Sequence, residues 1–123
     1  MKDSLIISLI IIMVVIGNII SQSILKNDSE RLIEKIETLK NELGTDNANT
    51  IAEELQDLWE EIEKKWSIIV SHQELDNIKI SIIAVKSSIE SGDISYSYQQ
   101  CENAIFLVEH QNEKWALKWK NIF

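Results

Sequence analysis

The chain has 123 residues, of which 45% are apolar and 26% are charged, and it contains no proline and a single cysteine. At roughly 100–200 residues per domain, this length allows one domain. The lone Cys101 excludes an intrachain disulfide, and two histidines with three glycines exclude His-rich metal sites and glycine-rich phosphate loops. The net charge of −8 argues against nucleic acid as a partner, because a surface that binds phosphates needs excess positive charge.

The N-terminal segment predicts where the protein resides. Residues 4–25 carry no charge, and as a helix a segment of about 20 residues spans about 30 Å, the hydrocarbon thickness of a bilayer. The segment is apolar all round rather than along one face, which favours a membrane span over a buried core helix. We therefore predict a membrane anchor over residues 1–27 and a helical domain over residues 28–123.

Cleavage and orientation each have two interpretations. Ser21 and Ser23 provide the small residues of a signal-peptidase site, but the apolar block is longer than in most signal peptides, which favours a retained anchor. Counted strictly, the positive-inside rule favours a cytoplasmic C-terminal part, because Lys26 and the cations after it outnumber Lys2. A short start with one Lys directly before an apolar run is nevertheless typical of export. We expect a single-pass protein of the cell membrane with its helical domain outside the cytoplasm.

A first helix of the domain is predicted over residues 29–43. Asp28 or Ser29 could cap it, because their side-chain oxygens can accept from the free N–H groups of a first turn. Gly44 would end it by adopting a left-handed conformation. The apolar seam begins at the membrane exit, so the alternative is one helix that continues the anchor. The seam consists of Leu25, Leu32, Ile36, Leu39 and Leu43, with Ser29 in the missing place.

A second helix is expected to start at Thr50, because Thr50 and Glu53 have the spacing of a capping box. Its apolar stripe includes Trp59 and Trp66, seven residues apart on one face, which we expect to be core residues. β-Branched residues and a second capping box at Ser71 then indicate a break. If that break is only a kink, the second and third helices form one rod of roughly 60 Å.

The third helix is predicted to stop at Gly92, and Asp93 can cap a fourth helix. A short final helix is expected from about Asn112. Short connections between amphipathic helices favour antiparallel packing. The predicted fold is therefore all-α, with an N-terminal transmembrane helix followed by a small antiparallel bundle of about four helices plus a short C-terminal helix.

Several segments resemble a known family. Trp59 and Trp66 are followed by Ser71-His-Gln-Glu-Leu-Asp-Asn-Ile78, and later come Lys86-Ser-Ser-Ile89 before a Gly-Asp turn, the pair Glu109-His110 and a terminal Lys120-Asn-Ile-Phe123. With the N-terminal anchor, these segments resemble the small clostridial membrane-anchored family known as domain of unknown function 4363. The resemblance implies a single-pass protein of spore-forming anaerobes with no established activity and no assigned functional residues. Such proteins are often encoded beside a multi-pass YetF-like membrane protein, which implies a membrane partner.

The strongest chemical constellation is the pair His72 and Asp76, one helical turn apart, where an imidazole and a carboxylate could meet. A zinc site would need further ligands, and His110 on a facing helix is the only further histidine. The simpler interpretation is that acids in a first turn complement the helix dipole. We therefore predict no catalytic residue, no metal site and no cofactor, and we expect no enzyme. Cys101 lies at a seam position and is expected to be a buried thiol.

The C-terminal segment offers further interaction candidates. Lys114 and Lys118 are one turn apart, as are Trp115 and Trp119, so cations and rings form adjacent stripes. The rings could close the open end of the bundle with the lysines facing the acidic second helix, which we favour, or the segment could return to the membrane surface. The predicted function is a protein-interaction or structural module that binds another protein or itself. The alternative is a ligand-sensing or regulatory domain for a neighbouring multi-pass membrane protein.

Overall fold

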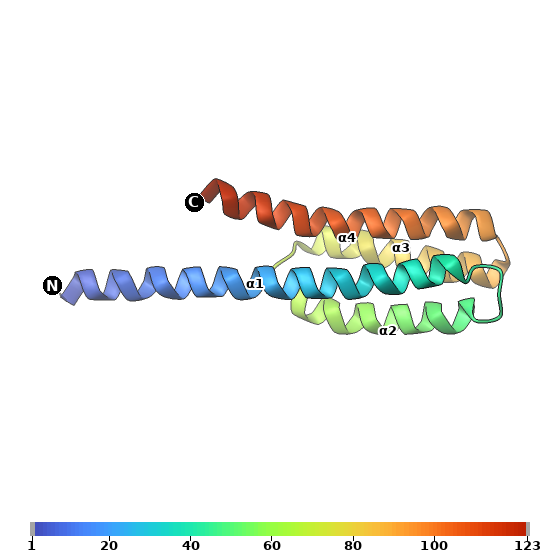
Figure 1. Ribbon diagram of the computed structural model, residues 1–123, viewed down its shortest axis with the longest axis horizontal. Coiled ribbons are helices and arrows are strands. Elements are labelled where there is room, and N and C mark those ends of the chain that lie inside the picture. Colours follow the sequence, from blue (N-terminus) through green and yellow to red (C-terminus); the bar gives the residue numbers. More distant parts are fainter. Residues whose placement is uncertain (1, 123) are drawn as a thin grey trace.

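The computed structural model describes the backbone of residues 2–122 and the side chains of residues 2–115. The described chain folds into four helices without a strand: α1 (Lys2–Asn41), α2 (Ala48–Trp66), α3 (His72–Ser91) and α4 (Ile94–Ile122). Successive helices run antiparallel, and α1 and α3 each pack against both α2 and α4 (Figure 1). The predicted all-α bundle with a long apolar N-terminal helix is therefore confirmed.

The first helix is one continuous element, so the predicted start near Ser29 is wrong. Asp28 and Ser29 lie in the middle of α1 and are 3% and 2% exposed, because they face the bundle and not solvent. Their N–H groups are paired within the helix and need no cap. The alternative of a helix that continues the anchor is the correct one. The helix ends at Asn41, and Gly44 turns the chain with a positive φ of 86°.

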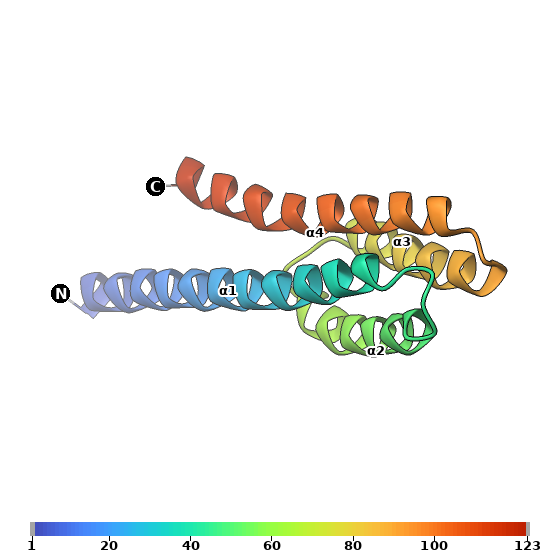
Figure 2. The same ribbon diagram turned by 45° about the vertical axis from the view of Figure 1, so that its right-hand side comes forward.

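The N-terminal half of α1 projects beyond the bundle (Figures 1 and 2). It is long and apolar enough to cross a membrane, and none of its apolar window is buried in the protein. Its large apolar side chains from Leu5 to Ile20 are at least half exposed, apart from the partly covered Val15. This segment is therefore not a core helix of the bundle. Burial begins at Leu25, where the other helices reach α1.

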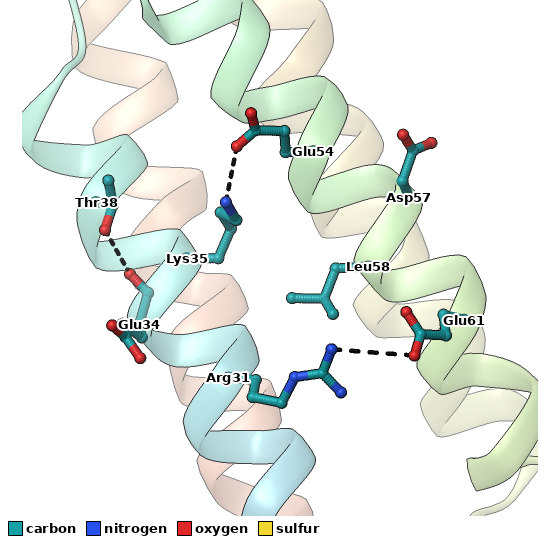
Figure 3. Close-up of a pocket in the computed structure, with 8 residues that line it drawn as sticks. All are labelled: Arg31, Glu34, Lys35, Thr38, Glu54, Asp57, Leu58 and Glu61. Carbon is teal, nitrogen blue, oxygen red and sulfur yellow. Dashed lines mark hydrogen bonds and ion pairs between the residues drawn. The ribbon is translucent and has the colours of Figure 1, made fainter.

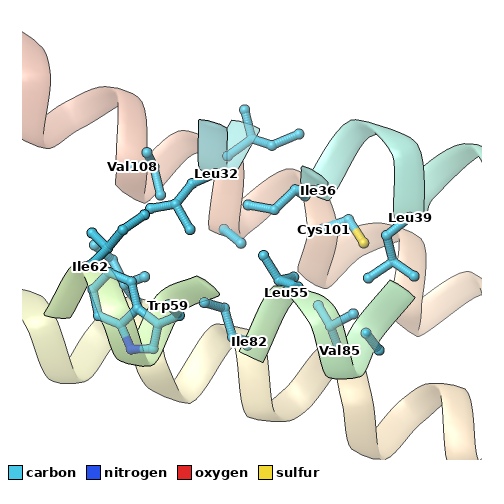
Figure 4. Packing of buried hydrophobic residues seen from close by; sticks show 14 of the residues in the cluster. Leu32, Ile36, Leu39, Leu55, Trp59, Ile62, Ile82, Val85, Cys101 and Val108 are labelled. Atoms are coloured by element: carbon cyan, nitrogen blue, oxygen red, sulfur yellow. The ribbon is translucent and has the colours of Figure 1, made fainter. Parts of the chain in front are cut away.

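The core lies where all four helices overlap (Figure 4). Trp59 and Trp66 are 2% and 0% exposed, which confirms them as core residues, and their rings meet edge to face with centroids 5.9 Å apart. Cys101 is also fully buried, as predicted. The seam residues of each helix provide the rest of the core, including Leu32, Ile36, Leu39, Leu55, Ile62, Ile78, Ile82, Val85, Ala104 and Val108.

The helix ends agree only in part with the predicted caps. α2 begins at Ala48, two residues before Thr50, and the side chain of its N-cap residue Asn47 makes no capping hydrogen bond. The chain enters α2 through a turn in which Ala48 N–H donates to Thr45 O at 3.2 Å. At α3 the Ser71 hydroxyl accepts from Glu74 N–H at 3.4 Å, and α2 and α3 are separate antiparallel helices rather than one rod. Gly92 follows α3 with a φ of 79°.

The fourth helix is longer than predicted. Asp93 caps it by accepting from Tyr96 N–H at 3.0 Å, as expected. The helix then runs without interruption to Ile122, so the separate short helix from Asn112 does not exist. No glycine or proline occurs after Asp93 to end the helix earlier. As a result, the end of α4 extends past α2 and α3 on the side of the projecting half of α1 (Figures 1 and 2).

Candidate functional site

Charged side chains span a hollow between α1 and α2 (Figure 3). This hollow has a volume of about 520 Å³ and is open to solvent. Lys35 Nζ lies 2.7 Å from Glu54 Oε2, and Arg31 Nη2 lies 3.9 Å from Glu61 Oε1, so cations of α1 face carboxylates of α2. Leu58 is the one apolar residue of its lining. The arrangement joins the two helices electrostatically.

The outer faces of α3 and α4 form a groove of a different kind. It has a volume of about 400 Å³, and its large apolar side chains Ile80, Ile83 and Tyr96 are 63%, 49% and 44% exposed. Between them α3 presents a stripe of small residues, Ala84, Ser87, Ser88 and Ser91. We call this surface the α3–α4 groove.

Sequence reasoning missed the α3–α4 groove. The buried seam of α3 runs through Leu75, Ile78, Ile82 and Val85. Ile80 and Ile83 lie outside that seam, and this excess of apolar residues on a helix that already has an apolar face is the signal that could have revealed the groove.

A third surface lies at the end of the bundle from which α1 projects, which we call the anchor-side end. The connection of residues 67–71, the start of α3 and residues 111–115 of α4 meet α1 there, around a small cavity of about 120 Å³. Lys114 Nζ lies 2.7 Å from Glu74 Oε1, and Trp115 packs partly buried against the core. The lining residues are Leu25, Ile69, Val70, Ser71, Glu74, Gln111, Lys114 and Trp115.

The electrostatics of the anchor-side end centre on Glu74. Burial, the largest single effect, pushes the pKa of its carboxyl group upward, whereas hydrogen bonding to Lys114 and the Lys114 charge push it downward. Hydrogen bonds with Gln111 and Ser71 act in the same direction, so the pKa lies below its ordinary value. The carboxylate therefore stays ionised at neutral pH and binds the start of α3 to the end of α4.

The predicted interaction residues are only partly brought together. Lys114 and Trp115 reach the anchor-side end, but Lys114 pairs with Glu74 of α3 and not with the acidic second helix, because α4 contacts α3 and α1 rather than α2. His72 and Asp76 both lie exposed on the first turns of α3. The side chains of Lys118 and Trp119 lie outside the described residues.

The described residues hold few groups suited to chemistry. Within them, no set of three or more His, Cys, Asp or Glu side chains is placed to hold a metal ion. Burial raises the pKa of the Cys101 thiol to about 11, so the thiolate that a nucleophile needs is scarce at neutral pH.

The comparisons with known proteins agree with this description. The model of a family described as "Domain of unknown function (DUF4363)" matches residues 19–122, which include the last turns of the apolar half of α1 and all of the bundle. Neither the curated proteins nor the solved structures contain a match to this chain. Because the family model covers most of the sequence, the chain belongs to the DUF4363 family.

Proposed function

We propose that this protein is a single-pass membrane protein whose bundle docks a helix of a partner protein along the α3–α4 groove. The projecting half of α1 supports the anchoring, because its exposed apolar residues would otherwise face water along its whole length. The groove supports the docking and is the observation on which the proposal depends.

The chemistry of the groove fits an apolar helix. Small residues at Ala84, Ser87 and Ser91 let a second helix approach closely, while Ile80 and Ile83 provide flanking apolar ridges. Full burial of an exposed isoleucine contributes about 1.5–3 kcal/mol, and since Ile80 and Ile83 are 63% and 49% exposed, docking would gain roughly half of that from each. The salt-bridged hollow between α1 and α2 is lined instead mostly by charged side chains, with Leu58 as its one apolar residue.

The position of the groove favours a partner in the same membrane. α3 packs against α2 and α4 but not against α1, so the outer face of α3 that carries the groove remains open to a neighbour whose helices extend from the same bilayer. Confinement of both proteins to one membrane raises their effective concentration and lets a modest groove suffice.

Photo-crosslinking in native membranes tests the docking. A crosslinker in place of Ile83 should capture one protein of defined mass, and the same crosslinker in place of Glu60 on α2 should not. The product should disappear when Ile80 and Tyr96 are changed to Ser, with the melting temperature unchanged because both side chains are exposed. Equal capture from both positions would contradict the proposal, and capture of only a second copy would favour a structural self-association.

Fractionation tests the anchoring. The protein should remain with membranes in alkaline carbonate, because about 20 apolar residues would be held in lipid. A mature N-terminus at Ile24 would contradict a retained anchor. Added protease should digest the bundle in intact wall-stripped cells if the bundle lies outside the cytoplasm, and protection until lysis would reverse that orientation.

Regulation of a neighbouring multi-pass protein is the second candidate, favoured by the continuity of α1. One uninterrupted helix includes both the apolar segment and the bundle residues Leu25 to Leu39, so rotation or tilt of one part moves the other. A single stoichiometric multi-pass protein in the crosslinked product would favour this role. Ligand sensing has less support, because the cavity of about 120 Å³ is smaller than the roughly 300 Å³ of small ligand pockets and the hollow of about 520 Å³ is open to solvent and lined mostly by charged residues.

A further inference from the structure

We propose that the anchor-side end of the bundle rests on the surface of the same bilayer that α1 spans, with Ile68 inserted at the interface and lysines on anionic headgroups. The inference depends on the anchoring part of the proposed function, but it concerns a different surface from the α3–α4 groove. The proposed binding partner of the connection between α2 and α3 is a lipid surface.

The first observation is the exposure of Ile68. Its side chain is 89% exposed, more than that of any other large apolar residue in the part of the chain that the structure describes. The turn that presents it is well fixed: Ile69 N–H and Val70 N–H both donate to Trp66 O, at 2.9 and 2.7 Å. Ile69 and Val70 pack against the core, so the connection is held in place while Ile68 points outward.

The second observation is the level of Ile68 along α1. Ile69 and Val70 line the same small cavity as Leu25, which places the connection level with that turn of α1. Leu25 is five residues from Ile20, the last exposed large apolar residue of the projecting half, a rise of about 7–8 Å. The headgroup layer on each side of a bilayer is about 5–7 Å thick, and interfacial apolar groups bury about 5–10 Å deep. Ile68 therefore lies within reach of the interface whichever way the protein is oriented.

The third observation is the charge around Ile68. Lys26 on α1 and Lys64 in the last turn of α2 are exposed, and neither forms an ion pair with another described residue. Among the acids of this end, Asp28 and Glu74 are paired with Lys65 and Lys114. Two exposed lysines without an ion pair in the described residues therefore lie on the turns of α1 and α2 next to this connection, although the whole chain carries a charge of −8. Lysines beside an apolar group are the combination that anionic membrane surfaces attract.

Site-specific quenching in the full-length protein tests the proposal. A fluorophore is attached to Ile68→Cys in a Cys101→Ala background, and the protein is placed in lipid nanodiscs that contain a lipid with a quencher on its headgroup. Asp46→Cys, in the exposed turn at the opposite end of the bundle, is the matched control, and Ile12→Cys reports on the span with a lipid quenched in its acyl chain.

We expect the label at position 68 to be quenched several-fold more than the label at position 46. Equal quenching at 68 and 46, with position 12 quenched, would overturn this inference alone and leave the anchoring intact. Absence of quenching at position 12 would overturn the anchoring and this inference together.

Lipid charge tests the role of the lysines. Quenching at position 68 should increase several-fold from zwitterionic to anionic nanodiscs, and Lys26→Glu with Lys64→Glu should abolish that increase. The same reversal at Lys79, an exposed lysine on the side of α3, should leave it unchanged. If quenching at position 68 did not change with lipid charge, the assignment of the lysines to anionic headgroups would be overturned.

Discussion

Asp28 of α1 accepts a hydrogen bond from the Lys65 ammonium of α2 at 3.1 Å, although only 5% of the Asp28 side chain is exposed. Arg31 lies one turn further along α1 and donates to the same carboxylate at 3.4 Å. Both cations remain more than two-fifths exposed. The contact is therefore asymmetric, because only the carboxylate has been removed from water and depends on its partners.

This asymmetry predicts which partner matters more. Lys65→Met should lower the free energy of unfolding by about 1–3 kcal/mol, because it leaves a buried carboxylate with only a long contact to Arg31. Asp28→Asn should cost less, since an exposed lysine returns to water. Lys35→Met is the control, and should cost at most about 1 kcal/mol because its partner Glu54 is half exposed. Denaturant unfolding of the full chain in detergent, followed by tryptophan fluorescence, would measure all three. Equal losses for Lys65→Met and Lys35→Met would contradict the argument.

The same residue shows why the sequence misled at one helix start. Asp28 and Ser29 before an apolar seam have the local pattern of an N-cap, and local pattern is all that a single sequence offers. The partner that makes a buried Asp28 tolerable is Lys65, 37 positions away in the chain. A pairing at that distance follows from the packing of α1 against α2, which periodicity does not report.

Helix faces were more predictable than helix ends. The seam through Leu32, Ile36 and Leu39 is buried as expected, because apolar spacing of three and four directly reports the face turned to the core. The α3–α4 groove could not be predicted in the same way. Whether Ile80 and Ile83 are covered depends on which helices lie nearby, and in this bundle α3 has neighbours only in α2 and α4.

Trp66 provides a test of the core. Trp66→Ala should cost roughly 3–5 kcal/mol, because the ring is fully buried and its removal leaves a cavity beside Trp59. Trp66→Phe should cost clearly less, since the indole Nε1 has no hydrogen-bond partner among the described residues and its loss breaks no bond. A loss below about 1 kcal/mol for the alanine variant, measured by denaturant unfolding, would contradict the burial.

The pair of Glu74 and Lys114 predicts a pH dependence. Because the pKa of Glu74 is lower in the folded protein than its ordinary 4.5, its contribution to stability is complete at neutral pH. The contribution is lost as the pH falls below 4.5 and past the pKa of Glu74 in the folded protein, because the carboxyl group is then protonated in both the folded and the unfolded state. Glu74→Gln should therefore be less stable than the unmodified chain at pH 7, by about 1 kcal/mol, and the difference should shrink as the pH falls below 4.5. Parallel melting curves across this pH range would measure it, and a difference that does not shrink with falling pH would refute the ionic origin.

Cys101 offers a probe of how often the bundle opens. Its side chain is fully buried, and burial raises its pKa to about 11, so at pH 8 only about one thiol in a thousand would be ionised even if reagent could reach it. Alkylation of the native protein by iodoacetamide should therefore be slower by orders of magnitude than alkylation of Asp46→Cys, which presents a thiol in the exposed turn before α2. Because the core around Cys101 must open before reagent enters, Lys65→Met should accelerate the reaction at Cys101 about tenfold for each 1.4 kcal/mol of stability that it removes. Mass spectrometry of timed samples gives both rates in one tube. If Cys101 of the native protein reacted as fast as the exposed thiol, the burial of Cys101 would be contradicted. If Lys65→Met did not accelerate the reaction at Cys101, the stabilising role of the contact between Asp28 and Lys65 would be contradicted.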